Sequence, residues 1–222
     1  MFQVEQGNFG LWRVRQIVDA PNVTDDFYRL GRLPLKYESG LFKVDTQTTD
    51  FNCSVSHVVT AGRLQGISLE EERVGSEIGL TEMGVDPDQM YRGMTKMGIR
   101  SRLLENMSVA QLTEILHGGN HVVIINYQEP ECSIEEQLSG DAGHYAMAFT
   151  VDSKGFVLLG ESSDDGSSRI HISQLQAYWY DVSLRTGKWF FGTGIVVPIT
   201  YKRRSFASTG RDIGAILQGS TL

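Results

Sequence analysis

The chain has 222 residues, 41% of them hydrophobic, so it can bury a sizeable core as one large domain or one domain with appendages. A net charge of −7 and a pI of about 5.2 argue against general nucleic-acid binding. Two cysteines make no disulfide framework, the first residues do not resemble a signal peptide, and no stretch approaches the roughly 20 apolar residues of a membrane helix. These features predict a cytoplasmic protein with no membrane or nucleic-acid partner.

The first half of the chain predicts one strand followed by helices. Residues 11–18 alternate between apolar and polar side chains, which is typical of a strand. From Cys53 the apolar residues have helical spacing, and this pattern ends at Gly66. Ser68 precedes Leu69 and three acids, which predicts a second helix with Ser68 as its cap.

Two more helices have clearer starting signals. Asp86 and Pro87 open one of them, with proline at the first helical position, and Gly98 ends it. Ser108 opens the other, because Gln111 three residues later completes a capping box.

The second half of the chain predicts strands. They span residues 122–127, 144–151, 155–160 and 194–199. A tight hairpin over residues 152–155 joins the second strand to the third, with Gly155 at a position that tolerates positive φ. A short helix over residues 173–180 is predicted with Ser173 as its cap. Helices followed by an antiparallel sheet indicate an α+β fold, in which an N-terminal helical half packs on a C-terminal sheet.

The segment from Gln47 to Cys53, with His144 ninety-one positions after the cysteine, is the most informative pattern in the chain. A cysteine attacks only as its thiolate, which a helix N-terminus and a neighbouring imidazolium both stabilise. His144 is therefore the candidate base. Gln47 and the backbone N–H of Cys53 are the candidate donors to a developing oxyanion.

The imidazole needs a third group that accepts its other N–H. His144 opens one strand of the predicted hairpin, so residues near 161–163 on the returning strand lie level with it. Glu161 is the first carboxylate there and is the preferred orienting residue. Asp164 and Asp165 follow closely and remain alternatives.

The loop over residues 128–142 is rich in acids and leads into His144. A solvated loop is one interpretation. The other is that the loop lines the cleft and favours a basic or amine-bearing substrate. Glu135, Glu136 and Tyr145, which follows His144, are then the candidate substrate-binding residues.

The remaining histidines and the second cysteine predict no further site. His117 and His121 lack additional ligands at suitable spacing, so neither a metal nor a cofactor is expected. Cys132 lies in an acidic segment that disfavours a thiolate. His57 lies four residues after Cys53 on the same helical face, where it could perturb the thiol, although a core or surface role is more ordinary.

From about Leu33 to Pro198 the chain resembles the papain-like peptidases of the bacteriocin-leader-processing, or double-glycine, type and their stand-alone relatives. Gln47 with Cys53 matches the first family motif, Gly143, His144 and Tyr145 match the second, and the turn and strand ending at Glu161 and Ser162 match the third. Two positions depart from the family pattern. Ser54, Val55 and Ser56 replace the usual Gly-Pro-Ala after the cysteine, and Glu161 replaces an aspartate.

The resemblance implies a papain-like domain over residues 33–201, with an N-terminal arm at 1–32 and a flexible tail at 202–222. It implies that Cys53 is the nucleophile, His144 the base, Gln47 the oxyanion donor and Glu161 the orienting residue. It also implies the stand-alone form, without the membrane spans and ATPase of the exporter relatives.

These residues predict a thiol peptidase that hydrolyses an amide bond of a peptide or small protein. The same chemistry also permits an acyltransferase or amide-forming enzyme. A non-catalytic papain-like module that binds peptides is the alternative from another class. The oligomeric state and the cleavage preference stay open.

Overall fold

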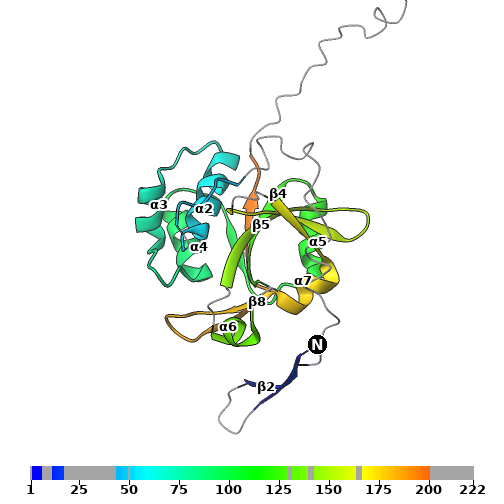
Figure 1. Cartoon of the computed structure of the whole chain (residues 1–222). Coiled ribbons are helices and arrows are strands. Elements are labelled where there is room, and N and C mark those ends of the chain that lie inside the picture. The colour runs from blue at the N-terminus through cyan, green and yellow to red at the C-terminus, as the bar shows by residue number, and fades with distance from the viewer. Residues whose placement is uncertain are drawn as a thin grey trace, which may run out of the picture.

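The computed structural model describes residues 2–6, 12–17, 44–49, 51–129, 132–139, 143–163 and 167–200 (Figure 1). The predicted tail at 202–222 lies outside the described residues, as do most of the arm at 1–32 and both Asp164 and Asp165. Within the arm, β1 (Phe2–Gln6) and β2 (Trp12–Ile17) form an antiparallel pair, and β2 falls on the predicted strand.

A six-stranded sheet lies at the centre of the domain, in the order β3–β10–β4–β5–β6–β7. Every neighbouring pair in it is antiparallel. Its strands are β3 (Arg102–Leu104), β4 (His121–Gln128), β5 (Gly143–Val151), β6 (Phe156–Gly160), β7 (Ser167–His171) and β10 (Gly194–Pro198). Two short strands, β8 (Tyr180–Val182) and β9 (Trp189–Phe191), form a separate hairpin.

Helices cover both faces of the sheet (Figure 1). One face carries α2 (Cys53–Leu64), α3 (Glu71–Ile78) and α4 (Pro87–Lys96), and the other carries α5 (Val109–His117) and α7 (Ile172–Tyr178). The short helix α6 (Ile134–Ser139) lies close to β8. The α+β class is therefore confirmed.

Two hydrophobic cores result from this layering because alternate residues of each strand face opposite sides. Ile124 and Met147 pack with the α2–α4 layer, whereas Val123, Ile125 and Ala146 pack with α5 and α7. Met90 and Met94 of α4 and Met97, the residue that caps the end of this helix, contribute to the first core. The catalytic candidates lie where the first layer meets the ends of β4 and β5.

Most sequence-based predictions of element starts are confirmed, and two are wrong. Asp86 and Ser108 form capping boxes at the starts of α4 and α5. Ser68 is not a cap, because α3 starts at Glu71 and its N-cap is Glu70. The approach to α3 passes Leu69, which packs against the first core, and its Cδ1 would lie 2.7 Å from a Cβ at Gly62 of α2.

The second wrong cap is Ser173. β7 runs directly into α7, and the imidazole of His171 accepts a hydrogen bond from the Ser173 backbone N–H. The helix therefore begins before the residue that the sequence suggests. The predicted hairpin turn is confirmed, with Gly155 at a φ of 82°.

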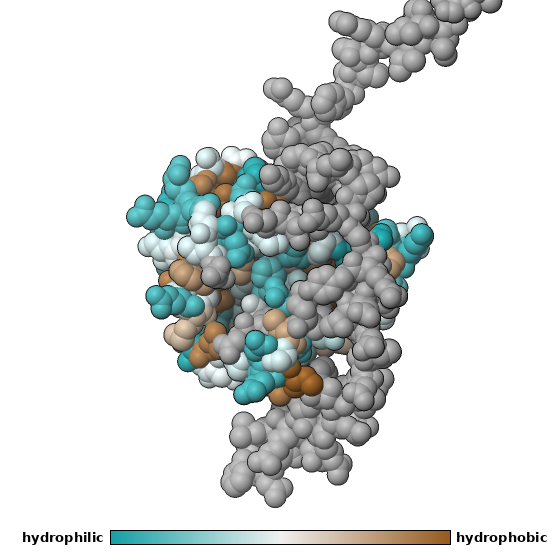
Figure 2. Space-filling model, in the orientation of Figure 1, coloured by the Kyte–Doolittle hydropathy of each residue, from teal (hydrophilic) through white to brown (hydrophobic). Residues whose placement is uncertain are grey.

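Hydrophilic and hydrophobic side chains are mixed on the face drawn in Figure 2. Some large hydrophobic side chains of the domain stay exposed, and Met83, at 53%, and Leu184, at 42%, both line the cavity described below. Trp189 and Phe191 of β9 stack on each other at a centroid distance of 5.9 Å. Within the described residues, no helix combines the length and apolar character needed to cross a bilayer.

Candidate active site

Cys53 is the first residue of α2 and is half-buried. Asn52 precedes it, and its side chain turns away from the helix instead of capping it. The Asn52 Oδ1 accepts hydrogen bonds from the backbone N–H groups of Thr48 and Thr49, each at 3.1 Å. The positive end of α2 is thus left to the Cys53 sulfur and its surroundings. Ser54, Val55 and Ser56 are compatible with a helix that starts at the cysteine.

His144 is the second residue of β5, within one position of the predicted strand start, and its ring lies beside Cys53 at the same cavity. Its Nε2 is 3.0 Å from the Glu161 Oε2, and its side chain is 15% exposed. Burial lowers the pKa of His144, but hydrogen bonds and charges from Cys53 and Glu161 outweigh burial and hold that pKa well above its usual value. The imidazole is therefore biased towards its charged form.

Glu161 follows β6 directly and is 7% exposed. Besides His144, its carboxylate accepts a hydrogen bond from Ser168 Oγ at 2.7 Å and a longer one from the Tyr127 hydroxyl at 3.5 Å. Burial is the largest single cause and raises the pKa of Glu161, but the hydrogen bonds from His144 and Ser168 and the charges of His144 and His57 together leave the pKa below its usual value. The ring of Tyr127 also packs edge-on against His144, with centroids 5.9 Å apart.

Gln47 is tied to the strand end next to Glu161. Its backbone N–H donates to the Ser162 carbonyl at 2.7 Å, and its side-chain Oε1 accepts from Ser162 Oγ at 2.7 Å. Because the amide oxygen is held by Ser162, the Nε2 group faces away from it. Gln47 is not among the residues that line the cavity beside Cys53.

His57 is fully buried and connects the start of α2, at Cys53, with the end of β6, at Gly160. Its Nδ1 lies 2.6 Å from the Cys53 carbonyl oxygen, and its Nε2 lies 3.2 Å from the Gly160 carbonyl oxygen. Burial is the main cause that lowers the pKa of His57. His57 therefore occupies a core position, in contact with the first turn of α2 and with the end of β6.

A cavity of about 170 Å³ lies next to Cys53 and His144. Tyr145 lines it, and its hydroxyl donates to the Val85 carbonyl at 2.8 Å. Glu135 and Glu136 do not line it. Glu136 instead accepts a hydrogen bond from the Ser133 backbone N–H at the start of α6.

One acid of the loop over residues 128–142 does approach His144. The Glu129 Oε1 lies 3.7 Å from the His144 Nδ1, and the Glu129 side chain is 39% exposed.

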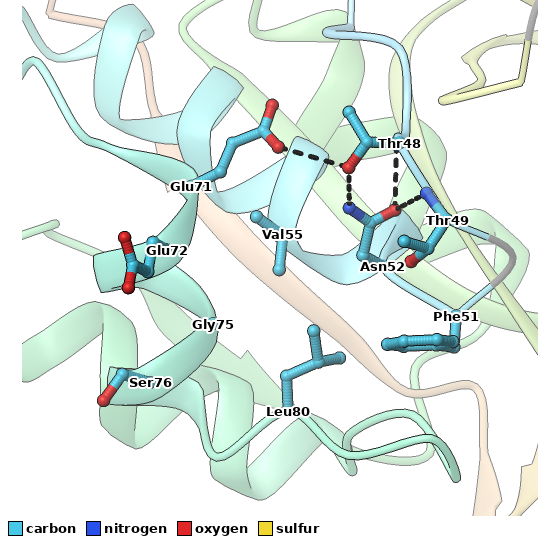
Figure 3. Close-up of a pocket in the computed structure, with 10 residues that line it drawn as sticks. All are labelled: Thr48, Thr49, Phe51, Asn52, Val55, Glu71, Glu72, Gly75, Ser76 and Leu80. Atoms are coloured by element: carbon cyan, nitrogen blue, oxygen red, sulfur yellow. Dashed lines mark hydrogen bonds between the residues drawn. The ribbon is translucent and has the colours of Figure 1, made fainter.

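A second, larger cavity of about 340 Å³ lies between the Thr48–Thr49 turn and α3 (Figure 3). The hydrogen bonds of Asn52 to this turn are visible there, and Thr48 Oγ1 lies 3.5 Å from Glu71 on α3. Phe51 lines both cavities, so they share this residue as part of their walls.

Several residues around the site have no signal in the sequence. Asp181 of β8 lies at the cavity and bonds Asn126 of β4, and Ser168 of β7 supports Glu161. The strand alternation of β4 could have indicated Asn126, because it is a polar residue within an apolar run. The short strands β7 and β8 are not predicted, so the residues they contribute could not be placed.

No family model matches the chain, and no curated protein matches it. Solved structures do match. The peptidase domain of Streptococcus ComA, a bifunctional ABC transporter, gives a TM-score of 0.53 at 12% identity, covering 71% of this chain and 98% of that one. A double-glycine motif protease from an AMS/PCAT transporter, in complex with its leader peptide, gives 0.51 at 12% identity, covering 70% and 90%. A structure described as a C39-like peptidase from Bacillus anthracis gives 0.53 at 13% identity, covering 69% and 92%.

The fold is thus that of the papain-like peptidase domains of the bacteriocin-processing type. The family resemblance predicted from the motifs is confirmed at the level of the fold.

Proposed function

We propose that this chain is a cysteine peptidase that hydrolyses an amide bond of a peptide or small protein. The observation that carries the proposal is the placement of His144, which lies beside Cys53 and 3.0 Å from the Glu161 carboxylate. A thiol at a helix start, a charged imidazole and a buried carboxylate form the arrangement that a thiolate nucleophile requires. The peptidase fold of the solved neighbours supports the same conclusion.

In the proposed reaction the Cys53 thiolate attacks the substrate carbonyl carbon and forms a tetrahedral oxyanion. His144 then gives its proton to the leaving amine, the C–N bond breaks, and an acyl thioester remains on Cys53. Water attacks the thioester while His144 accepts its proton, which releases the acid and restores the thiolate. Glu161 orients the imidazole throughout and stabilises its positive charge.

Gln47 is proposed as the side-chain donor to the oxyanion, together with N–H groups at the start of α2. The hydrogen bond that Ser162 Oγ donates to the Gln47 amide oxygen supports this role, because it leaves the Gln47 N–H groups directed away from Ser162. One donor of this kind is worth about 3 kcal/mol in the transition state. The AMS/PCAT protease was solved with a leader peptide, which supports a peptide as the substrate class here.

The proposal is tested by alkylation with iodoacetamide near pH 6, followed by mapping of the labelled cysteine. Cys53 should react about tenfold or more faster than Cys132, because Cys53 begins α2 and shares its cavity with His144, whereas the Cys132 Sγ lies 3.9 Å from the Glu129 carboxylate, which disfavours a thiolate. His144→Ala should remove most of this difference. His117→Ala is the matched control, since it removes an exposed histidine at the end of α5 and should leave the labelling unchanged.

Equal and slow labelling of both cysteines would overturn the proposal and favour a peptide-binding module. If Cys53 is selectively reactive, a turnover assay on a peptide pool with an added primary amine separates two enzyme classes. Release of free acid supports the peptidase, whereas accumulation of a new amide indicates acyl transfer instead.

A further inference from the structure

The cavity beside Cys53 has one wall that the proposed mechanism does not use. This wall consists of Asp181, which belongs to β8, and Asn126, which belongs to β4. Gly143 borders the wall so closely that a Cβ there would lie 2.6 Å from the Asp181 Oδ1. Because Gly143 immediately precedes His144, the wall is adjacent to the proposed base.

The Asp181 carboxylate is held by two side-chain amides from alternate positions of β4. Asn126 Nδ2 donates to its Oδ2 at 2.7 Å, and Gln128 Nε2 donates to its Oδ1. The Val182 backbone N–H also donates to Oδ1, at 2.8 Å. Since both amides use their NH₂ groups on the carboxylate, both turn their oxygens elsewhere.

These two amide oxygens have no hydrogen-bond partner among the residues that the structure describes. Asn126 is only 3% exposed, lines the cavity and leaves its Oδ1 unpaired. Ser54 Oγ, on the same cavity, is also buried without a partner. Gln128 does not line the cavity, so the Asn126 oxygen is the one that bears on an occupant of the wall. Buried acceptors are rarely left without a donor, so a group that reaches Asn126 should donate a hydrogen bond.

The charges around the cavity indicate the sign of that occupant. Three carboxylates line it, Glu82, Asp86 and Asp181, and no lysine or arginine is among its described lining residues. Arg185 pairs with Asp86 at 2.7 Å but does not line the cavity. Burial, with a smaller contribution from the Asp86 charge, raises the pKa of Asp181 to about 6, so a cation beside it would relieve an unfavourable negative charge.

We propose that Asp181 and Asn126 form a subsite for a cationic N–H group of the substrate, the ammonium of a lysine or the guanidinium of an arginine. Asp181 supplies the opposite charge, and the Asn126 Oδ1 accepts one of the N–H groups. The inference rests on the proposed peptidase function and deepens it, because it places a basic residue of the peptide next to the bond that Cys53 attacks.

The test uses the whole chain and the rate at which Cys53 is alkylated. The probes are N-(aminoalkyl)chloroacetamides of increasing chain length, each compared with an uncharged N-alkyl chloroacetamide of equal length. Guanidinoalkyl analogues distinguish a preference for arginine from one for lysine. At the chain length that reaches Asp181, the cationic probe should react about tenfold faster than its neutral partner.

Two variants show whether this preference belongs to the subsite. Asp181→Asn removes the charge at the wall and should bring the rate ratio of cationic to neutral probe close to one. Glu114→Gln removes an equal charge from an exposed position on α5, on the other side of the sheet, and should keep the wild-type ratio. The rate at Cys132 corrects for any general attraction of cations to the acidic chain.

Equal rates for cationic and neutral probes in the wild type at every length would overturn the inference, even if Asp181→Asn does not fold. Persistence of the preference in a folded Asp181→Asn protein would overturn it as well. The proposed function is read separately, from iodoacetamide labelling and its dependence on His144. Even if Cys53 reacts slowly, the ratio of its rates with the cationic and the neutral probe can still be measured. The proposed function and the proposed subsite can therefore fail independently.

Discussion

Glu161 holds His144 in its proposed working orientation, and three side chains surround its carboxylate. His144 and Ser168 contact it at 3.0 and 2.7 Å, and the Tyr127 hydroxyl is more distant at 3.5 Å. The Glu161 side chain is one methylene longer than the aspartate side chain of the family pattern. The 3.0 Å separation shows that the longer side chain still reaches the imidazole.

We expect Glu161→Gln to lower the pKa of His144, because it removes a charge and a hydrogen bond that raise it. Cys53 alkylation near pH 6 should then slow by about a hundredfold, since the thiolate loses its cationic partner. Ser168→Ala removes only one supporting hydrogen bond and should have a smaller effect in the same direction. The imidazole titration followed by NMR is the direct measurement, and an unchanged His144 curve in Glu161→Gln would contradict the assignment.

The same pair makes stability depend on pH. The raised pKa of His144 contributes stability that is complete below about 6.5 and is lost as pH rises through the raised value. The lowered pKa of Glu161 contributes stability that is present above about 4.5 and is lost as pH falls through the lowered value. Both contributions are complete only between these two limits.

Glu161→Gln should therefore destabilise the protein most between about pH 4.5 and 6.5, by about 3 kcal/mol, because it removes the buried carboxylate that stabilises the charged form of His144. The difference from wild type should shrink as pH rises through the raised pKa of His144. Urea unfolding at several pH values measures it. Stability curves that run parallel from acid to alkaline pH would show that the two groups are not coupled.

At the scale of elements, α2 is built from a sequence that differs from the family pattern. Ser54 and Ser56 are both buried, and neither hydroxyl has a partner among the described residues. The family has alanine at the position of Ser56, which is fully buried. Ser54 lines the cavity beside Cys53, whereas Ser56 does not.

Ser56→Ala should stabilise the chain by about 1 kcal/mol, because it removes an unpaired buried hydroxyl and introduces the best helix former. In a chain of this size the melting temperature should rise by about 2–4 °C. Calorimetry measures the change, with iodoacetamide labelling of Cys53 as a check that the site is unaltered. A lower melting temperature would mean that the hydroxyl has a bonding role.

At the scale of the whole molecule, the sequence predicts the contacts between residues that lie close together along the chain. Glu161 can be placed beside His144 because a short hairpin with a glycine turn connects their strands. Asp181 cannot be placed beside Asn126 in this way, because the two residues are 55 positions apart in the sequence and Asp181 lies on a strand of only three residues. The caps at Ser68 and Ser173 fail for a related reason: packing of Leu69 and continuity with β7 decide where those helices begin.

The hydrogen bonds between Gln47 and Ser162 join residues 115 positions apart and therefore have a kinetic consequence. Contacts of such long sequence separation form late, because a long loop must close before any bond compensates for the lost entropy. On refolding from denaturant, helical circular dichroism should recover first and rapid Cys53 alkylation later. Thiol reactivity would then report the moment at which the helical layer docks on the sheet, and simultaneous recovery of both signals would indicate a single concerted step.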